Sequence, residues 1–167
     1  MAMGKGGRVV NVVIAGLGGQ GVLKASDLLA GAVFSLGLDV KKSEVHGMSQ
    51  RGGSVQSDVR YGPRVDSPMV PPGEADFLVV LAPDQVEAAR HCLKPGGVLI
   101  GTGRICEDRL PNRRSMNTAL MGVLSAYLEI PVEAWLGAIA AAFPAKILEV
   151  NRAAFLLGRE SAAPGKA

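Results

Sequence analysis

A glycine-rich turn between an apolar segment and an amphipathic segment constrains the fold of this chain more than any other feature. Residues 9–15 are mostly β-branched and nearly all apolar, which is typical of a strand buried on both faces of a parallel sheet. The turn Gly16-Leu17-Gly18-Gly19-Gln20-Gly21 follows, and residues 22–36 then place apolar side chains at roughly helical spacing. The sequence therefore begins with a strand, a tight turn and a helix, as α/β folds do.

The rest of the sequence continues this alternation and then becomes helical. Apolar or alternating segments predict four further strands, at residues 38–45, 54–61, 77–81 and 98–100. Helical spacing and proline boundaries predict four further helices, at residues 84–93, 117–128, 132–142 and 145–157. The order β-α-β-β-β-α-β followed by helices predicts an α/β fold, a three-layer α/β/α sandwich with a mixed, mostly parallel sheet. We expect one domain over residues 9–160, with flexible tails at residues 1–8 and 161–167.

Composition limits what the chain is expected to bind. Hydrophobic residues make up 48% of its 167 residues, enough for a substantial core, and the net charge is only +3. The basic residues do not cluster with aromatic residues as they do on nucleic-acid-binding surfaces. Their densest group fits a solvated loop or a subunit contact: Arg104, Arg109, Arg113 and Arg114. Because no apolar run approaches the length of a membrane span, we expect a soluble, cytoplasmic protein that binds neither nucleic acid nor membrane.

The cysteine content argues against a metal cluster held by this chain. An iron–sulfur cluster needs four thiolates, whereas the sequence has only Cys92 and Cys106, which do not form a C-x-x-C pair. Cys92 falls within a helical pattern, so we predict that it is a small buried residue.

Three interpretations fit the glycine turn. Glycines at these positions allow a tight crossover and close helix packing. The exposed amides at a helix start also favour an anion such as phosphate. A dinucleotide site would need an acidic residue about twenty positions further on, where Asp39 and Glu44 lie, although Lys41 and Lys42 occupy the middle of that strand.

Two glycine-rich segments, taken together, carry a resemblance to a known family. The first is Gly16-Leu17-Gly18-Gly19-Gln20-Gly21-Val22-Leu23, and the second is Ser43-Glu44-Val45-His46-Gly47-Met48-Ser49-Gln50-Arg51-Gly52-Gly53-Ser54-Val55. Both closely resemble the signature of the small (beta) subunit of indolepyruvate ferredoxin oxidoreductase. They also resemble, less closely, the gamma domain of pyruvate and 2-ketoisovalerate ferredoxin oxidoreductases. Matches continue over most of residues 9–160 and include Gly73-Glu74-Ala75-Asp76, Leu93-Lys94-Pro95-Gly96-Gly97, Asn117, Thr118, Gly122, Phe143, Lys146, Glu149, Asn151, Ala154, Phe155 and Gly158.

The resemblance implies a fold similar to domain III of pyruvate:ferredoxin oxidoreductase and a subunit that is inactive alone. A larger partner subunit is expected to carry thiamine diphosphate, Mg and 4Fe-4S clusters, to pass electrons to ferredoxin and to use coenzyme A as co-substrate. No cofactor is expected on this chain, and the isolated chain is expected to expose apolar surface and to self-associate. The resemblance assigns no catalytic residue and no metal ligand here. It places ligand- or partner-contacting residues in the two loops: Gly16, Gly18, Gly19, Gln20, Gly21, His46, Gly47, Met48, Gln50, Arg51, Gly52 and Gly53.

The roles of three polar residues in these loops stay open. Arg51 has the fork needed to clamp a carboxylate or phosphate, and His46 can donate or accept a hydrogen bond. Both residues could instead fasten the turn to Glu44 or to backbone carbonyls. Gln20 could form a hydrogen bond at the helix start or contact the partner.

The sequence departs from the family pattern between residues 101 and 116. The family usually has about thirty further residues here, forming another strand and helix. The sheet is therefore expected to lack an edge strand, and the substrate contacts that the family makes in this region do not carry over to this sequence. Two alternatives therefore remain: a nucleotide-binding module, and a stand-alone interaction domain derived from the subunit.

Overall fold

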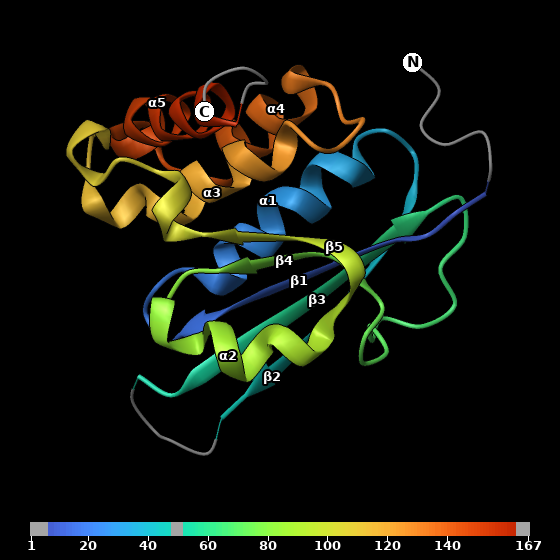
Figure 1. Cartoon of the computed structure of the whole chain (residues 1–167). Coiled ribbons are helices and arrows are strands. Elements are labelled where there is room, and N and C mark those ends of the chain that lie inside the picture. Colours follow the sequence, from blue (N-terminus) through green and yellow to red (C-terminus); the bar gives the residue numbers. More distant parts are fainter. Residues whose placement is uncertain (1–6, 48–51, 163–167) are drawn as a thin grey trace.

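The computed structural model describes residues 7–47 and 52–162, and its elements follow the predicted order (Figure 1). The strands are β1 (Val10–Leu17), β2 (Asp39–His46), β3 (Ser54–Gly62), β4 (Ala75–Val80) and β5 (Leu93–Gly101). The α-helices are α1 (Val22–Phe34), α2 (Val86–Ala89), α3 (Met116–Ser125), α4 (Val132–Ala142) and α5 (Ala145–Ser161). Short 3-10 turns flank α2 and occupy much of the segment between β5 and α3.

Strand β1 lies at the centre of a mixed five-stranded sheet with the order β2-β3-β1-β4-β5. It pairs antiparallel with β3 from Val10↔Tyr61 to Leu17↔Ser54, and parallel with β4. Strand β2 pairs antiparallel with β3, and β5 pairs parallel with β4. The mixed sheet is confirmed, with its four pairings divided equally between parallel and antiparallel rather than mostly parallel. Within the described residues no strand follows β5, which forms that edge of the sheet.

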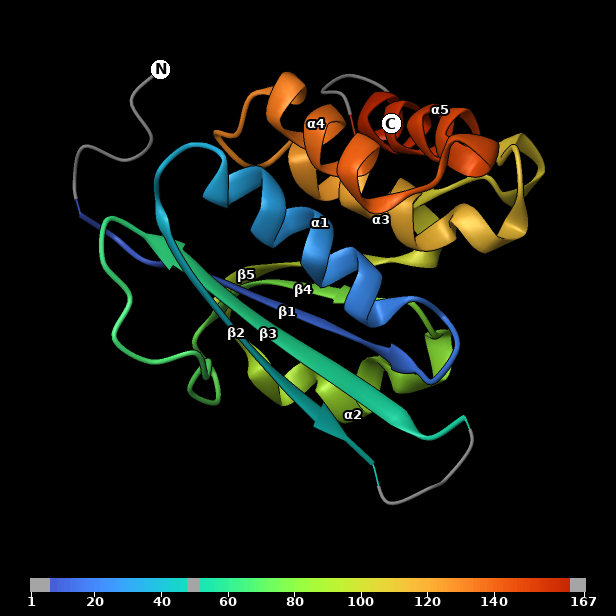
Figure 2. The same cartoon turned by 180° about the vertical axis from the view of Figure 1, so that it is seen from behind.

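The two faces of the sheet are covered unequally (Figures 1 and 2). Helices α1, α3, α4 and α5 lie over one face, where the larger core contains Leu28, Leu120, Trp135 and Phe155. The short α2 lies on the other face, over a small cluster that includes Val13, Leu78 and Cys92. The predicted three-layer arrangement is confirmed, with a thin third layer.

Helices α3 and α5 cross at very short range because each presents a glycine to the backbone of the other. A Cβ atom added to Gly158 would overlap the carbonyl oxygen of Ala119 and lie 2.7 Å from its carbonyl carbon. A Cβ atom added to Gly122 would likewise overlap the carbonyl oxygen of Phe155. Beside this crossing, the buried Thr118 hydroxyl donates to Asn151 Oδ1 at 2.8 Å. Four of the residues that carried the family resemblance therefore pack these helices together.

Strand β5 begins earlier than the sequence predicts. The strand is predicted to start at residue 98, after a helix at residues 84–93, but Lys94-Pro95-Gly96-Gly97 also lies inside β5. It can do so because the pairing with β4 shifts register between Ala75 and Phe77. Gly96 has a φ of 78° at this irregularity, a left-handed conformation that glycine tolerates.

Asp76 is a buried carboxylate that fastens the start of β1 to β4 and β5. Its Oδ1 accepts from Arg8 Nη2 and from Lys94 Nζ, each at 2.5 Å. Its Oδ2 accepts from the backbone amide of Asn11 at 2.8 Å. Arg8, which the sequence assigns to a flexible tail, is thus hydrogen-bonded to the sheet. At the other end of the chain, α5 continues to Ser161, the first residue of the second predicted tail.

Replacing Asp76 by alanine is expected to lower the free energy of unfolding by about 2 kcal/mol. The main cost is the buried Asn11 amide left without an acceptor, since the Arg8 and Lys94 side chains, 64% and 35% exposed, can regain water. Urea denaturation of the full chain measures the change. The control is Asp66→Ala, which removes a carboxylate that is 79% exposed and paired with Arg64, and it should cost less than about 0.5 kcal/mol. Equal costs for the two variants would contradict this role of Asp76.

Candidate site at the glycine loop

The glycine loop, residues 16–21, lies where β1 ends and α1 begins. Strand β4 runs parallel to β1, so the carboxyl ends of both strands meet at this edge of the sheet. The backbone amide of Leu81, just beyond β4, donates to the carbonyl of Ala15 at 2.8 Å. Ligands of α/β folds bind preferentially at this edge, beyond the carboxyl ends of the strands.

Gln20 braces the glycine loop from inside. Its side-chain Oε1 accepts a hydrogen bond from the backbone amide of Leu17 at 2.7 Å, and its backbone amide donates to the Leu17 carbonyl at 3.2 Å. A Cβ atom on Gly16 would lie 2.9 Å from this same Oε1, so glycine is needed for the close approach. The Gln20 side chain thus binds the end of β1, whereas no side chain of the described residues caps the start of α1.

Gly21 begins α1 in a conformation that favours glycine and lies against α3. Its φ is 83°, and Asn117 Nδ2 of α3 donates to its carbonyl at 3.2 Å. A Cβ atom on Gly21 would overlap the Asn117 amide group and lie 3.0 Å from its Cγ. The loop is thus held from both the sheet and the helical layer.

The structure brings the two glycine-rich segments together. The amide of Gly18 donates to the carbonyl of Gly53 at 2.9 Å, and the amide of Gly47 donates to the carbonyl of Ser54 at 2.7 Å. His46, exposed at the end of β2, joins the glycine loop in lining a cavity of about 400 Å³. Three further site residues that the sequence singles out, Met48, Gln50 and Arg51, lie outside the described residues.

A second cavity, which we call the arginine cleft, adjoins the glycine loop on the side of α3. Its volume is about 570 Å³, and it is lined by Gly19, Gln20, Gly21, Leu81, Arg113, Arg114, Met116 and Asn117. The two arginines were not among the predicted site residues, because their group was interpreted as a solvated loop or subunit contact. The adjacent pair just before a helix was the signal that could have singled them out.

The arginine cleft is electropositive. Arg113 and Arg114 are exposed, and within the described residues neither forms an ion pair. The adjoining start of α1 has no acidic residue in its first turn, and no side chain of the described residues caps it. The free amides and dipole of a helix start attract anions, and arginine binds phosphate oxygens through its fork of donors. The geometry therefore supports the anion interpretation of the glycine loop alongside the packing interpretation.

The dinucleotide interpretation lacks its acidic residue. Asp39 pairs with Gly62 at the far end of the sheet from the glycine loop. There it accepts hydrogen bonds from the Val65 amide at 2.7 Å and from Lys41, which lower the pKa of its carboxyl group. Glu44 lies nearer the loop but is exposed and forms an ion pair with Lys42. Neither carboxylate is placed to bind a ribose held at the glycine loop.

The described residues offer no metal site, and no helix among them is long and apolar enough to cross a membrane. Cys92 is only 6% exposed, which confirms the predicted burial, and Cys106 is exposed. Burial, together with the nearby Asp58 carboxylate, raises the pKa of the Cys92 thiol. This chemistry is typical of a structural thiol.

Solved structures of known proteins share this fold. It superposes on the gamma subunit of a keto/oxoacid ferredoxin oxidoreductase from Geobacter sulfurreducens PCA with a TM-score of 0.71, 24% identity and coverage of 92% of this chain and 98% of that one. It also superposes, with a TM-score of 0.77 and 20% identity, on a 2-oxoglutarate:ferredoxin oxidoreductase from Magnetococcus marinus, solved with 2-oxoglutarate, coenzyme A and succinyl-CoA bound. That match covers 96% of this chain and 32% of the other. The predicted likeness to an oxidoreductase gamma-type domain is confirmed.

The sequence defines the family. The chain belongs to the pyruvate ferredoxin/flavodoxin oxidoreductase family, whose model matches residues 11–105 and 102–161. Its curated relatives include the indolepyruvate oxidoreductase subunit IorB of Pyrococcus horikoshii, which is 49% identical over 96 residues. That alignment covers 56% of this chain and 46% of the relative, so it spans about half the length of the curated relative. The two family-model segments meet at residues 102–105, within the stretch where the sequence is shorter than the family pattern.

Proposed function

We propose that this chain is the small, non-catalytic subunit of a cytoplasmic 2-oxoacid:ferredoxin oxidoreductase of the indolepyruvate or aryl-pyruvate type. In this proposal it completes the active site of a larger subunit, which oxidatively decarboxylates the 2-oxoacid to an acyl-CoA and passes electrons to ferredoxin. The observation that carries the proposal is the convergence of the glycine loop, the start of α1, Arg113 and Arg114 on one cleft. The proposed reaction, oxidative decarboxylation of a 2-oxoacid, is inferred from the family and from the similarity to the IorB relative.

The cofactors are assigned to the partner subunit. Four thiolates are needed for each 4Fe-4S cluster, and this sequence contains two cysteines, one of them buried. Thiamine diphosphate and Mg are likewise proposed for the larger subunit, where they would supply the decarboxylation chemistry. The residues of this chain would then bind and orient coenzyme A and cover the active site of the larger subunit.

Coenzyme A is the co-substrate that best fits the arginine cleft. Its phosphate groups are anionic, and the cleft holds two arginines that form no ion pair with any described residue, beside a helix start that no described side chain caps. Gly19 adopts a positive φ, and a Cβ atom added to it would meet no atom of the described residues within 4 Å, so the backbone of the loop is open to close approach there.

The loop at residues 46–53 is proposed to contact the larger subunit. His46 and Val45 are exposed at its start, Val45 to 55%, and the amide of Gly18 ties the other end of the loop to the glycine loop. An exposed apolar residue beside a histidine on a sheet edge is suited to a protein interface. The same surface would favour self-association of the isolated chain.

Co-expression with the larger subunit tests this proposal. The assembled complex should reduce ferredoxin with indolepyruvate and coenzyme A, and the purified chain alone should be colourless and inactive. In the complex, the double variant Arg113→Ala/Arg114→Ala should raise the KM for coenzyme A about tenfold or more and leave the KM for indolepyruvate within about twofold, because only the phosphates lose their partners. The matched control is Arg152→Ala, which removes an exposed arginine from α5. Oxidation of an aryl-pyruvate by this chain alone, or an unchanged KM for coenzyme A, would contradict the proposal.

A further inference from the structure

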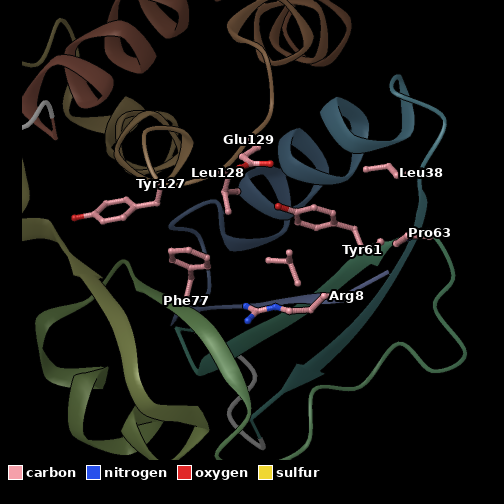
Figure 3. A pocket seen from close by; sticks show the side chains of 10 residues that line it. Arg8, Leu38, Tyr61, Pro63, Phe77, Tyr127, Leu128 and Glu129 are labelled. Atoms are coloured by element: carbon pink, nitrogen blue, oxygen red, sulfur yellow. The ribbon is translucent and has the colours of Figure 1, made fainter. Parts of the chain in front are cut away.

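A separate cavity lies at the opposite end of the sheet from the glycine loop (Figure 3). Its volume is about 320 Å³, and it is lined by Arg8, Val10, Leu38, Tyr61, Gly62, Pro63, Phe77, Tyr127, Leu128 and Glu129. These residues come from the start of β1, the end of β3, the first half of β4 and the turn that follows α3. The volume is at the lower end of the range for ligand pockets, about 300–1,000 Å³, and suits a molecule of one or two rings.

The walls of this aromatic cavity are suited to a flat apolar ligand. Phe77 and Tyr127 meet with ring centroids 5.9 Å apart and planes inclined at 59°, so they form a corner. Tyr61 lies across from them in Figure 3, and Val10, Leu38 and Leu128 add aliphatic surface. Aromatic rings favour tilted and offset contacts with other rings, and a third ring placed in this corner can make both.

Tyr61 supplies the polar group that orients such a ligand. Its side chain is only 3% exposed, yet within the described residues its hydroxyl has no hydrogen-bond partner. Figure 3 shows this hydroxyl pointing toward Leu128 and Glu129. The buried side-chain atoms without a partner are Ser43 Oγ, Ser57 Oγ and Trp135 Nε1 among the described residues, and the Tyr61 hydroxyl is not one of them, so its oxygen is open to the cavity and a ligand there can form a hydrogen bond with it. Burial, together with the nearby Asp76 and Glu129 carboxylates, raises the pKa of Tyr61, and the group therefore stays protonated as a donor.

The charges at the rim select against an anionic ligand. The Arg8 guanidinium is already paired with the Asp76 carboxylate. Glu129 is exposed, and among residues 7–47 and 52–162 it forms no ion pair, so it leaves a negative charge at the mouth of the cavity. A neutral hydroxyl group suits this pair of neighbours, since it can accept from Tyr61 and donate to Glu129.

We propose that the aromatic cavity is a binding site for a small neutral phenol-type molecule, whose ring lies against Phe77 and Tyr127 and whose hydroxyl group bridges Tyr61 and Glu129. This site is independent of the glycine loop, from which the length of β1 separates it. It therefore does not depend on the proposed oxidoreductase function.

Paired probes and variants test the proposal. p-Cresol and toluene differ only in the hydroxyl group, and each is titrated into the full chain while amide chemical shifts are recorded. p-Cresol should bind the wild-type chain about fivefold to tenfold more tightly than toluene, because it alone makes the two hydrogen bonds. In the variant Tyr61→Phe this preference should fall to about twofold. It should also fall in Glu129→Gln, and because Glu129 is exposed, this second substitution should not affect folding. Leu128→Trp should fill the cavity and weaken both probes, and benzoate should bind more weakly than p-cresol.

Three outcomes would overturn the proposal. The first is that neither probe shifts resonances of cavity residues in the wild-type chain. The second is a preference for p-cresol that persists unchanged in both Tyr61→Phe and Glu129→Gln. The third is binding to the isolated chain that disappears in the complex with the larger subunit, which would assign the cavity to a side chain of that subunit instead. Arg113→Ala, which lies at the other end of the sheet, should leave the affinities of both probes unchanged.

Discussion

Replacing Gly158 by alanine is expected to lower the free energy of unfolding by about 3 kcal/mol, measured by urea denaturation of the full chain. The new Cβ atom would overlap the carbonyl oxygen of Ala119, and the neighbouring atoms are equally fixed because they belong to the backbone of α3. Helices α3 and α5 must therefore move apart, which opens the packing around Phe155 and the hydrogen bond between Thr118 and Asn151. The intrinsic preference of alanine for helices offsets only about 1 kcal/mol of this cost.

Gly137 provides the matched control for this substitution. It lies within α4, is exposed, and a Cβ atom added to it would meet no atom of the described residues within 4 Å. Gly137→Ala should therefore be neutral or stabilise the chain by up to about 1 kcal/mol. If Gly158→Ala were as stable as Gly137→Ala, the close crossing of α3 and α5 would be wrong.

Replacing Gly21 by alanine is expected to reduce coenzyme A use by the assembled complex, with a rise of about tenfold or more in the KM for coenzyme A. An alanine there must adopt a φ near 83° and must displace the Asn117 amide, which then releases the Gly21 carbonyl. Both changes distort the start of α1 and one wall of the arginine cleft. Steady-state kinetics of the complex, with coenzyme A and the 2-oxoacid varied separately, measure the effect.

Gly19→Ala separates the two causes of this loss. Gly19 has a φ of 87°, close to that of Gly21, but a Cβ atom there would meet no atom of the described residues within 4 Å. The Gly19→Ala variant should therefore suffer only the backbone strain of the left-handed conformation, which costs about 1 kcal/mol. Its rise in the KM for coenzyme A should be smaller than that of Gly21→Ala. A double variant, Gly21→Ala/Asn117→Ala, should recover part of the loss by removing the overlap. An effect of Gly19→Ala as large as that of Gly21→Ala would mean that contact with Asn117 does not matter.

Much of the fold could be predicted from the sequence because its elements carry strong local patterns. The apolar segment before Gly16 and the segment around Leu78 are strands in the structure, and the prolines at 131 and 144 separate the last three helices. Strand order is a non-local property, and so is the choice between parallel and antiparallel partners for β1. The early start of β5 was missed for a related reason: Leu93 and Val98 both pair with β4, and the turn-forming residues Lys94–Gly97 lie between them at the register shift.

The candidate site could be predicted only in part. The glycine positions of both loops are visible as residue types, but the hydrogen bond between Gly18 and Gly53 that joins the loops is seen only in the structure. Arg113 and Arg114 lie more than ninety residues further along the chain and reach the glycine loop only because α3 packs beside it. The physical reason for glycine at positions 122 and 158 likewise could not be predicted, since each glycine lies against the backbone of a helix that is distant in the sequence.

The central strand β1 fixes the distance between the aromatic cavity and the glycine loop. Its eight residues pair along their full length with β3, and residues 12–14 are completely buried. At about 3.3 Å per residue, the six steps from Val10 to Gly16 hold the aromatic cavity and the glycine loop roughly 20 Å apart. A strand confined on both sides cannot lengthen or turn without breaking the sheet, so whatever occupies one end keeps a fixed offset from the other. Binding of the glycine loop by the proposed larger subunit would therefore also fix the position of the far end of this chain, with Arg8 and Tyr61, relative to that subunit.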